Sequence, residues 1–240
     1  MELSVVIPVF NEAACIRQLL DETRAQLEGQ VHYEVIVVDD GSTDSTAAVL
    51  ADCRRELPRL RVLHHRQCYG QSAALASGIN AARAPWVATL DGDGQNDPAD
   101  IMKLYQAMEQ SPGDVMMIAG ARRQRHDSWL RRVSSRVANR VRAALLGDDT
   151  FDTGCGLKLL PRAVFLSLPQ FSHMHRFLPA LVQRQGGEVK SVDVNHRPRQ
   201  LGSSKYGVMN RLWVGIIDLF GVWWLKRRAL RPIVDEVNGP

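Results

Sequence analysis

Several protein classes are excluded by what the sequence lacks. Its four cysteines include no C-x-x-C pair, so neither a zinc finger nor a disulfide framework is indicated, and a reducing compartment fits. Three histidines show no metal-ligand spacing, and we expect them at the surface or in hydrogen bonds: His173, His175 and His196. The first residues, MELSVVIPVF, have no basic stretch before their apolar run, unlike a secretory signal. We therefore expect a cytoplasmic protein.

The sequence also has no apolar run long enough to cross a membrane. The one membrane-like segment, Leu212–Leu225, has 14 residues and is interrupted by Asp218, whereas a spanning helix needs about 20. It is rich in tryptophan and is followed by basic residues, which suits a helix lying on a bilayer surface. Packing of this helix on the protein core is an equally open alternative.

Glycine-rich nucleotide motifs are absent too. No G-x-G-x-x-G follows the first predicted strand, and no G-x-x-x-x-G-K-[ST] occurs anywhere in the chain. These absences disfavour a dinucleotide-binding dehydrogenase and a P-loop nucleotide triphosphatase.

Acidic residues are scarce in one segment. Between Arg122 and Arg142 there are eight arginines and one acid, Asp127, although the formal net charge of the chain is only +4. On a helix predicted over residues 129–146, apolar residues follow one side and arginines recur every four residues on another. Such a block attracts phosphate groups, while a simple solvated helix face is the alternative.

What the sequence does contain is an alternation of strand and helix patterns. Apolar, β-branched runs predict strands over residues 3–10, 33–38, 59–65 and 85–90. Helical patterns follow the first three of these runs, over residues 13–27, about 44–57 and 71–83. Strands that are hydrophobic throughout and alternate with helices predict a parallel sheet covered on both faces.

Three polar motifs stand where predicted strands end: PVFNE, DDGS and DGDGQ. Ligands bind beyond the carboxyl ends of parallel strands, so the three motifs are expected to converge on one site. Asp91 and Asp93 repel each other unless a cation lies between them, and Gln95 adds an oxygen ligand suited to Mg²⁺ or Mn²⁺. The alternative is a turn in which Asp91 or Asp93 caps the helix after Pro98.

The DDGSTDST stretch predicts a strand exit followed by a helix that Ser42 or Asp44 caps. Two carboxylates, Asp39 and Asp40, exceed what a cap requires. A carboxylate at a strand end can accept hydrogen bonds from a nucleobase or a ribose hydroxyl, which makes this stretch a candidate nucleotide contact.

Taken together, PVFNE, DDGSTDST, DGDGQNDP, GAR at 120–122 and RQLGSSKYG at 199–207 resemble the inverting family 2 glycosyltransferases of GT-A fold. Within that family the chain looks most like the polyprenyl-phosphate, dolichol-phosphate mannose synthase type. The resemblance covers about residues 3–210. It implies an α/β fold with a mainly parallel central sheet, a nucleotide-binding part over about residues 1–120 and an acceptor-binding part over about 121–210. Residues 211–240 would form the Trp/basic C-terminal segment.

The resemblance also implies roles for individual residues. Arg122 would be a catalytic cation beside Asp91 and Asp93, which with Gln95 would hold the metal and the donor diphosphate. Nucleotide and donor contacts would come from Pro8, Phe10, Glu12, Val38, Asp40, Arg199 and Lys205. Acceptor phosphate contacts would come from Arg131, Arg132, Ser135 and Arg136.

This assignment makes chemical sense. A lipid monophosphate is largely dianionic at neutral pH, because its second pKa is about 6, and so it can attack the sugar without a protein base. Catalysis then consists of positioning two anions and stabilising the leaving diphosphate. The family more often has Ala and Leu in place of Gly92 and Gly94, so we expect a looser turn here. The Q-x-x-R-W signature of chain-extending synthases is absent.

The leading hypothesis is thus a metal-dependent transferase that moves a sugar from a GDP- or UDP-sugar to a polyprenyl phosphate of the cell envelope. It would act at the inner face of the cytoplasmic membrane, held there by the C-terminal segment or a membrane-anchoring partner, without nucleic acid and with a homo-oligomer left open. One rival is a transferase acting on a soluble or protein-linked hydroxyl, with Asp152 as base. The other is a non-catalytic module that binds nucleotide or phospholipid.

Overall fold

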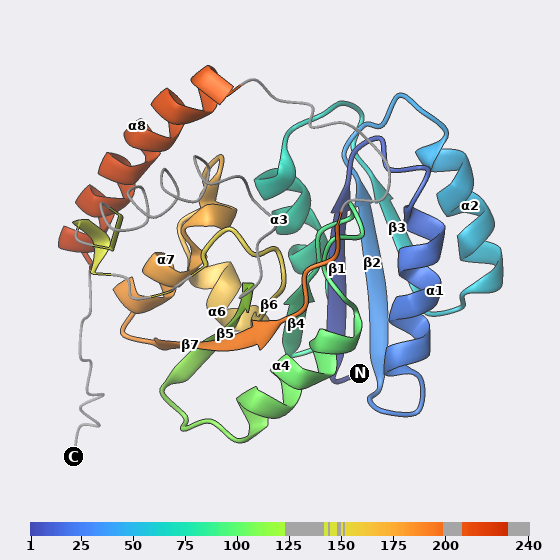
Figure 1. Ribbon diagram of the computed structural model, residues 1–240, viewed down its shortest axis with the longest axis horizontal. Helices are drawn as coiled ribbons and strands as arrows, with labels where there is room; N and C mark the ends of the chain where they lie inside the picture. The colour runs from blue at the N-terminus through green and yellow to red at the C-terminus, as the bar shows by residue number, and fades with distance from the viewer. Residues whose placement is uncertain (123–141, 144, 148–149, 151, 199–207, 230–240) are drawn as a thin grey trace, which may run out of the picture.

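The computed structural model describes residues 1–122, 142–143, 145–147, 150, 152–198 and 208–229 (Figure 1). The strands are β1 (Leu3–Val9), β2 (Tyr33–Asp39), β3 (Leu60–His64), β4 (Trp86–Thr89), β5 (Val115–Arg122), β6 (Lys158–Pro161) and β7 (Glu188–Val194). The helices are α1 (Ile16–Leu27), α2 (Thr46–Glu56), α3 (Gln71–Ala81), α4 (Ala99–Glu109), α6 (Arg162–Ser167), α7 (Leu178–Arg184) and α8 (Val208–Arg227), with a 3-10 turn η1 (Met174–Arg176). The predicted order of strands and helices is confirmed over residues 3–90.

The seven described strands form one sheet in the order β3-β2-β1-β4-β6-β5-β7. All neighbouring pairs are parallel except those of β6, which runs antiparallel to both β4 and β5. The start of β6 therefore lies beside the end of β4, with Lys158 opposite Thr89. This reversal brings the residues before β6 to the same edge of the sheet as the DGDGQ motif.

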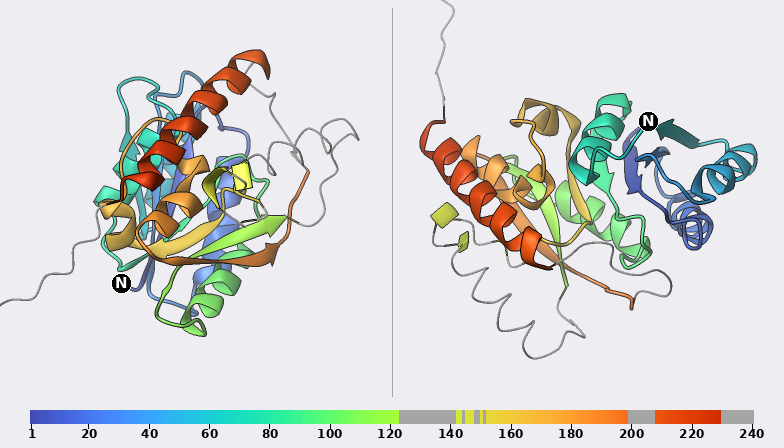
Figure 2. Two further views of the ribbon diagram at one scale, coloured as in Figure 1. Left: turned by 90° about the vertical axis from the view of Figure 1, so that its left-hand side faces the viewer. Right: turned by 90° about the horizontal axis from the view of Figure 1, so that it is seen from above.

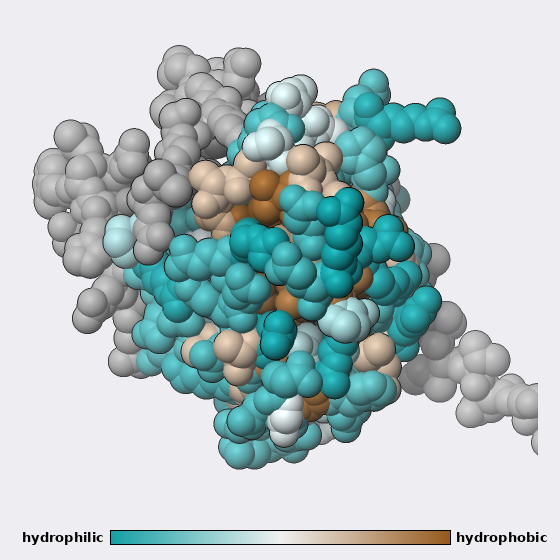
Figure 3. All heavy atoms as spheres, turned by 90° about the vertical axis from the view of Figure 1, so that its right-hand side faces the viewer, coloured by the Kyte–Doolittle hydropathy of each residue, from teal (hydrophilic) through white to brown (hydrophobic). Residues whose placement is uncertain are grey.

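Helices cover both faces of the sheet, as the apolar strands predict (Figure 1). One buried cluster joins the sheet to α1, α2 and α4 through residues such as Leu20, Leu50 and Ile101. The other joins it to α3, α6, α7 and α8 through residues such as Ile79 and Leu181. The outer surface over α2 and β3 is mostly hydrophilic, with apolar side chains showing between the polar ones (Figure 3).

The C-terminal helix α8 lies across α7, at the end of the molecule farthest from α1 and α2 (Figures 1 and 2). Its Val222 is fully buried in the second cluster, and Arg184 donates from Nε to the Leu225 carbonyl at 2.9 Å. The other side of the helix exposes Ile217, Phe220 and Trp224, of which Ile217 is 69% exposed. Packing of this helix on the core is therefore confirmed, while one apolar side stays open. Among the described residues, no helix has the length and apolar character to span a membrane.

The arginine-rich segment lies almost wholly outside the described residues, and of the helix predicted over 129–146 only residues 142–143 and 145–146 are described, in helical conformation. The arginines at its two ends are described, and both make contacts inside the protein. Arg142 is 8% exposed and donates to the carbonyl of Thr150 at 2.7 Å and to the Thr153 hydroxyl. Arg122 pairs with Asp152 at 2.6 Å.

Candidate functional site

The three polar motifs meet at the carboxyl edge of the sheet. Asn11 follows β1 in a left-handed conformation, and its backbone N–H donates to the Ser42 hydroxyl at 2.8 Å. Its side-chain oxygen accepts from the backbone N–H of Thr43 at 2.6 Å. The loop after β4 packs on the same place, because Gly92 lies against Val9 and the Pro8 carbonyl. The predicted convergence of PVFNE, DDGS and DGDGQ is confirmed.

The helix after β2 is capped differently from the prediction. The residue at the N-cap of α2 is Ser45, whose side chain makes no capping hydrogen bond. Asp44 accepts from the backbone N–H of Thr46 at 2.9 Å, so the prediction for Asp44 finds support in this contact. The prediction that Ser42 caps this helix is wrong. The Ser42 hydroxyl accepts from the backbone N–H of Asn11 and so joins the loops after β1 and β2.

Asp40 is 3% exposed and accepts hydrogen bonds from the loop before α3. The donors are the backbone N–H groups of Tyr69 at 2.9 Å and Gly70 at 2.7 Å, the His65 ring at 2.6 Å and the Cys68 thiol at 3.2 Å. Burial would raise the pKa of Asp40, but these hydrogen bonds together lower it below its ordinary value. Its carboxylate therefore fixes the loop over residues 65–70, and its predicted contact with a nucleotide stays a prediction.

Asp91 is placed differently. It is half-buried and accepts one hydrogen bond from a side chain, from Gln71 Nε2 at 2.8 Å. Desolvation and the neighbouring charge of Asp93 raise its pKa to about 6, although Lys158 and Arg122 oppose the shift. A carboxyl group with a raised pKa is one whose negative charge lacks compensation, which is the condition that a bound cation would relieve.

The alternative in which this pair caps α4 is wrong. The cap of that helix is formed at Pro98, and the carboxylate that accepts from its first backbone N–H, at Ala99, is Asp97 at 3.0 Å. Asp93 does form a local turn, because it accepts from the backbone N–H of Gln95 at 3.1 Å. Asp91 is left to face the cavity described below.

The glycines of this turn hold it close to the sheet. A Cβ at Gly92 would lie 2.6 Å from Val9 Cγ1 and 2.8 Å from the Pro8 carbonyl oxygen. Gly94 has a φ of +72°, which a leucine rarely adopts. Glycine at position 92 therefore allows a closer approach to β1 than alanine would, while the expectation of a looser turn stays a prediction.

The site fits a divalent metal ion. Mg²⁺ typically uses one or two protein carboxylates and completes its shell with substrate phosphates and water. Asp91 and Asp93 offer hard oxygen ligands, and the raised pKa of Asp91 indicates uncompensated charge at this point. Among the described residues, no three His, Cys, Asp or Glu side chains are grouped as a complete metal cage, so substrate oxygens would have to complete the shell.

Arg122 and Asp152 bind each other. The guanidinium donates to both carboxylate oxygens, from Nε at 2.6 Å and from Nη2 at 2.9 Å, and the Arg122 backbone N–H adds a third contact at 3.3 Å. Both side chains are largely buried, with 14% and 4% exposed. Such a bidentate, charge-assisted pair is among the stronger hydrogen-bonded contacts, so each side chain is held by the other.

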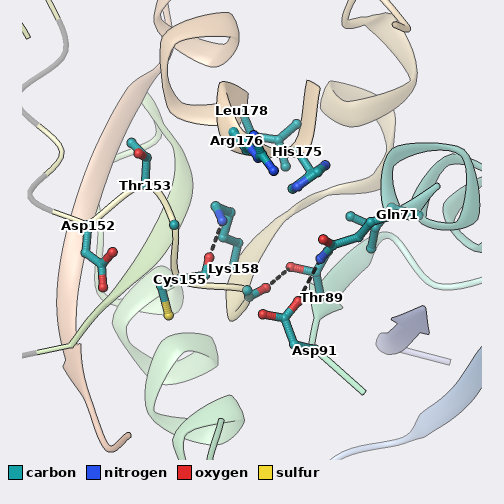
Figure 4. Close-up of a pocket in the computed structure, with 13 residues that line it drawn as sticks. Gln71, Thr89, Asp91, Asp152, Thr153, Cys155, Lys158, His175, Arg176 and Leu178 are labelled. Atoms are coloured by element: carbon teal, nitrogen blue, oxygen red, sulfur yellow. Dashed lines mark hydrogen bonds between the residues drawn. The ribbon is translucent and has the colours of Figure 1, made fainter. Parts of the chain in front are cut away.

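A pocket of about 390 Å³ opens between Asp91 and the start of β6 (Figure 4). Its walls come from α3, the end of β4, the segment 152–158 and η1 with the start of α7. A Cβ at Gly156 would lie 2.1 Å from Asp91 Cγ, so the bare backbone there makes room for the carboxylate. Thr89 donates to the Gly156 carbonyl at 2.6 Å and fixes that backbone.

The other predicted site residues fall into two groups. Pro8 and Val38 are buried at the ends of β1 and β2, and Phe10 and Glu12 lie half-buried in the loop after β1. The remaining predicted residues lie outside the described part of the chain: Arg131, Arg132, Ser135, Arg136, Arg199 and Lys205. The roles of all these residues stay predictions.

Sequence reasoning missed the residues of the pocket wall, namely Gln71, Gly156, Lys158 and His175. One signal was available for Lys158, a single charged residue in the run GLKLLP, which otherwise has the apolar character of a buried strand. Nothing in the sequence pairs Gly156 with Asp91, because that contact depends on the antiparallel placement of β6.

Comparison with known proteins places this chain in a family. The family model described as glycosyl transferase family 2 matches residues 4–168. A dodecaprenyl-phosphate galacturonate synthase of Rhizobium johnstonii is 35% identical over 97% of this chain and 69% of its own length. An undecaprenyl-phosphate 4-deoxy-4-formamido-L-arabinose transferase of Edwardsiella ictaluri is 34% identical over 86% of this chain. This chain covers 63% of the length of that second relative.

Solved structures agree on the fold. Glucosyl-3-phosphoglycerate synthase from Mycobacterium tuberculosis, crystallised with Mn²⁺, uridine diphosphate and phosphoglyceric acid, superposes with a TM-score of 0.70. The match covers 96% of this chain and 80% of that one at 21% identity, which establishes a common GT-A fold. A crystal structure of the same synthase with Mg²⁺ and uridine diphosphate also matches, with a TM-score of 0.70, 21% identity, and 94% of this chain and 79% of that one covered.

Proposed function

The chain belongs to glycosyl transferase family 2, and on that premise we propose that it transfers a sugar from a nucleotide diphosphate donor to a polyprenyl phosphate. It is a glycosyltransferase by family and by fold. The proposed acceptor follows the two named relatives, which are a dodecaprenyl-phosphate synthase and an undecaprenyl-phosphate transferase.

The observation on which the proposal rests is the pair of neighbouring carboxylates Asp91 and Asp93, of which Asp91 lines the pocket. Asp91 is the described aspartate whose pKa is raised most clearly, and its charge faces the space where a donor diphosphate would lie. Asp91, Asp93 and Gln95 would hold Mg²⁺ or Mn²⁺, whose positive charge would offset that of the departing nucleoside diphosphate. A diphosphate alone would be repelled by this pair.

The chemical step needs no proton transfer on the acceptor side. An oxygen of the lipid phosphate attacks the anomeric carbon from the side opposite the diphosphate, and the bond from that carbon to the diphosphate oxygen breaks with its electron pair. The nucleoside diphosphate leaves, and the configuration at the anomeric carbon inverts. Because the acceptor phosphate is already largely dianionic, no residue has to act as a base.

The pairing of Arg122 with Asp152 favours this acceptor over a hydroxyl. A hydroxyl acceptor would need a base, and Asp152 was the candidate. Both of its carboxylate oxygens accept hydrogen bonds from a largely buried guanidinium, so the side chain is already engaged with Arg122. The same pair holds Arg122 at the end of β5, beside the segment that would bind the acceptor.

The open side of α8 supports a location on the inner face of the cytoplasmic membrane. Ile217, Phe220 and Trp224 are exposed along one side, and the helix ends in Lys226 and Arg227. Apolar residues with adjacent basic ones suit anionic lipid head groups. A membrane-anchoring partner protein is an additional proposal.

Asp93→Asn tests the assignment. We expect transfer of radiolabelled sugar to undecaprenyl phosphate to fall by at least about 100-fold, as for loss of a group that stabilises transition-state charge. The thermal unfolding midpoint should stay near that of wild type. Asp52→Asn, at an exposed carboxylate on α2, serves as the matched control and should leave transfer unchanged. Retained turnover in Asp93→Asn would refute the metal assignment.

Two further measurements separate the proposed function from its rivals. Transfer to a soluble hydroxyl acceptor that is lost in Asp152→Asn, with polyprenyl phosphates ignored, would favour the hydroxyl-acceptor transferase. Nucleotide binding that calorimetry finds indifferent to Mn²⁺, together with no transfer to any acceptor, would favour a non-catalytic binding module.

A further inference from the structure

Lys158 is a buried cation at a position where the fold would normally place an apolar side chain. It begins β6 and is 4% exposed. Side chains alternate along a strand, so Lys158 and Leu160 point to the same face of the sheet. Leu160 belongs to the apolar cluster under α3, α6 and α7. The lysine therefore replaces a core residue at the edge of that cluster, where the cluster opens into the pocket.

The ammonium group of Lys158 lacks an ionic partner at contact distance. Its Nζ donates to the carbonyl of Cys155, and no carboxylate oxygen of the described residues lies within 4.0 Å of it. An ammonium group has three N–H donors, so most of its hydrogen-bonding capacity is unused. Burial lowers the pKa of Lys158, although the more distant Cys155, Asp91 and Asp152 oppose this shift. A buried charge in this state is costly until an anion joins it.

The pocket is shaped to bring such an anion to the lysine. Figure 4 shows the Lys158 ammonium between the Cys155–Gly156 backbone and the side chains of His175 and Arg176. His175 is hydrogen-bonded to the Ser72 hydroxyl at 2.8 Å. Burial lowers the pKa of His175 to about 3, so its ring is neutral at physiological pH. Lys158 is thus the deeply buried basic side chain of the pocket. A volume of about 390 Å³ falls within the range of small-molecule sites.

We propose that Lys158 is an anion-binding residue of this pocket and pairs with an anionic oxygen that the substrate brings in beside Asp91. Two parts of the substrates offer such an oxygen: a carboxylate on the transferred sugar, or a phosphate of the donor or acceptor. The inference rests on the proposed function, because it assigns a ligand group to the same site. It adds a substrate-binding residue and explains why a lysine stands where leucine or methionine would pack.

The test compares Lys158→Met with wild type, using nucleotide hexuronates and the matching neutral nucleotide hexoses as donors, each with uridine and guanosine as base. Loss of a charged hydrogen bond predicts a fall of about 10- to 100-fold in kcat/KM. A fall confined to hexuronate donors assigns the lysine to a sugar carboxylate. An equal fall for both donors, with weaker binding of the bare nucleoside diphosphate and Mn²⁺, assigns it to the donor phosphate. A raised KM for polyprenyl phosphate alone assigns it to the acceptor.

Stability separates this role from a structural one. Methionine at this position replaces a buried charge with an apolar chain of similar length, so the thermal midpoint should hold or rise while activity falls. Lys190→Met, at an exposed lysine on β7, is the matched control and should change neither. Lys158→Arg should recover part of the activity because it keeps the charge.

Wild-type kcat/KM for every substrate in Lys158→Met would overturn the proposal. If that variant does not fold, Lys158→Gln decides, because its amide can still donate to the Cys155 carbonyl but has no charge; full activity in Lys158→Gln would equally overturn the proposal. Failure of the proposed function is a different result. It would appear as no transfer by the wild-type protein to any polyprenyl phosphate, and calorimetric binding of the two donor types to the Lys158 variants would still test the inference.

Discussion

Two pairs of aspartates stand at the ends of β2 and β4, on either side of β1 in the same sheet, and the fold uses them in opposite ways. Asp39 is the last residue of β2 and Asp40 follows it, and both are almost fully buried. Asp39 accepts from the Ser42 N–H at 2.9 Å, and Asp40 accepts from four groups of the next loop. Asp91 and Asp93 follow β4 and receive little internal compensation, so the pKa of Asp91 is raised while that of Asp40 is lowered.

The contrast shows that a carboxylate at a strand end is not by itself a ligand site. What distinguishes the two pairs is whether the protein supplies donors to the oxygens. Where backbone N–H groups converge, as on Asp40, the charge stabilises the fold. Where a like charge and a desolvated wall converge, as on Asp91, the charge costs free energy in the absence of a cation and is available for binding.

The largest effect is expected from Gly156→Ala, which disturbs the second pair without touching its charge. A Cβ there would lie 2.1 Å from Asp91 Cγ, so the carboxylate must move. A displacement of about 1 Å can cost about 100-fold in rate, and we expect that loss in transfer activity with little change in unfolding. Gly154→Ala is the matched control, since its nearest neighbour is Arg122 Nη2 at 3.4 Å. Equal activity in the two variants would show that Asp91 tolerates displacement.

Asp40→Asn should break the first pair by removing charge from a buried carboxylate that accepts two backbone N–H bonds. Hydrogen bonds to a charged group contribute about 1.5–3 kcal/mol, so we expect a loss of about 2–3 kcal/mol in the free energy of unfolding by urea. Because the folded-state pKa of Asp40 is lowered, its stabilisation is complete above the unfolded value and is lost as the pH falls below 3.8. The variant should therefore lose less stability than wild type on acidification through that range.

Asp91→Asn should have the opposite sign in metal-free protein. Removing one of two neighbouring charges at a desolvated position relieves their repulsion, and we expect a gain of about 1–2 kcal/mol in the presence of a chelator. Urea unfolding of both variants in one buffer measures the contrast. If Asp91→Asn lost as much free energy of unfolding as Asp40→Asn, the two pairs would not differ in the compensation of their charges.

The smallest effect concerns His175. It tests whether burial alone determines in which direction the stability of the protein changes with pH. Burial is the main cause that lowers its pKa to about 3, so the unfolded chain binds a proton that the folded protein does not. Stability should therefore fall as the pH drops below about 6.5, by about 1 kcal/mol between pH 6.5 and 5.5. His175→Gln removes this contribution, and the difference between its pH profile and that of wild type isolates it. Coincident profiles would contradict the burial argument.

The sequence predicts the first half of the fold well because strands and helices there alternate in order, and each periodicity is local. The same is true of the strand-end motifs, whose convergence follows from parallel strands sharing one carboxyl edge. The prediction of a cap at Ser42 was wrong for a physical reason, because its hydroxyl accepts a hydrogen bond from Asn11, a residue distant in sequence. The sequence could not distinguish Asp40 from Asp91, since their donors come from other loops.

The pocket wall could not be predicted from local sequence patterns. The contact between Gly156 and Asp91 and the position of Lys158 opposite Thr89 both require β6 to run antiparallel to β4. Short apolar runs such as GLKLLP do not encode their direction in a sheet. The bidentate pairing of Arg122 with Asp152 likewise joins residues whose separate roles had been predicted from motifs.

That pairing also joins two distant positions of the chain. Arg122 ends β5 and Asp152 precedes β6, so a buried ion pair holds together residues that are 30 positions apart in the sequence. Closing a loop between fixed ends costs little more when the loop is longer. Within this interval Arg142 donates to the Thr153 hydroxyl and Leu146 is buried in the second cluster, so the interval is tied to the core by packing as well as by the ion pair at its ends.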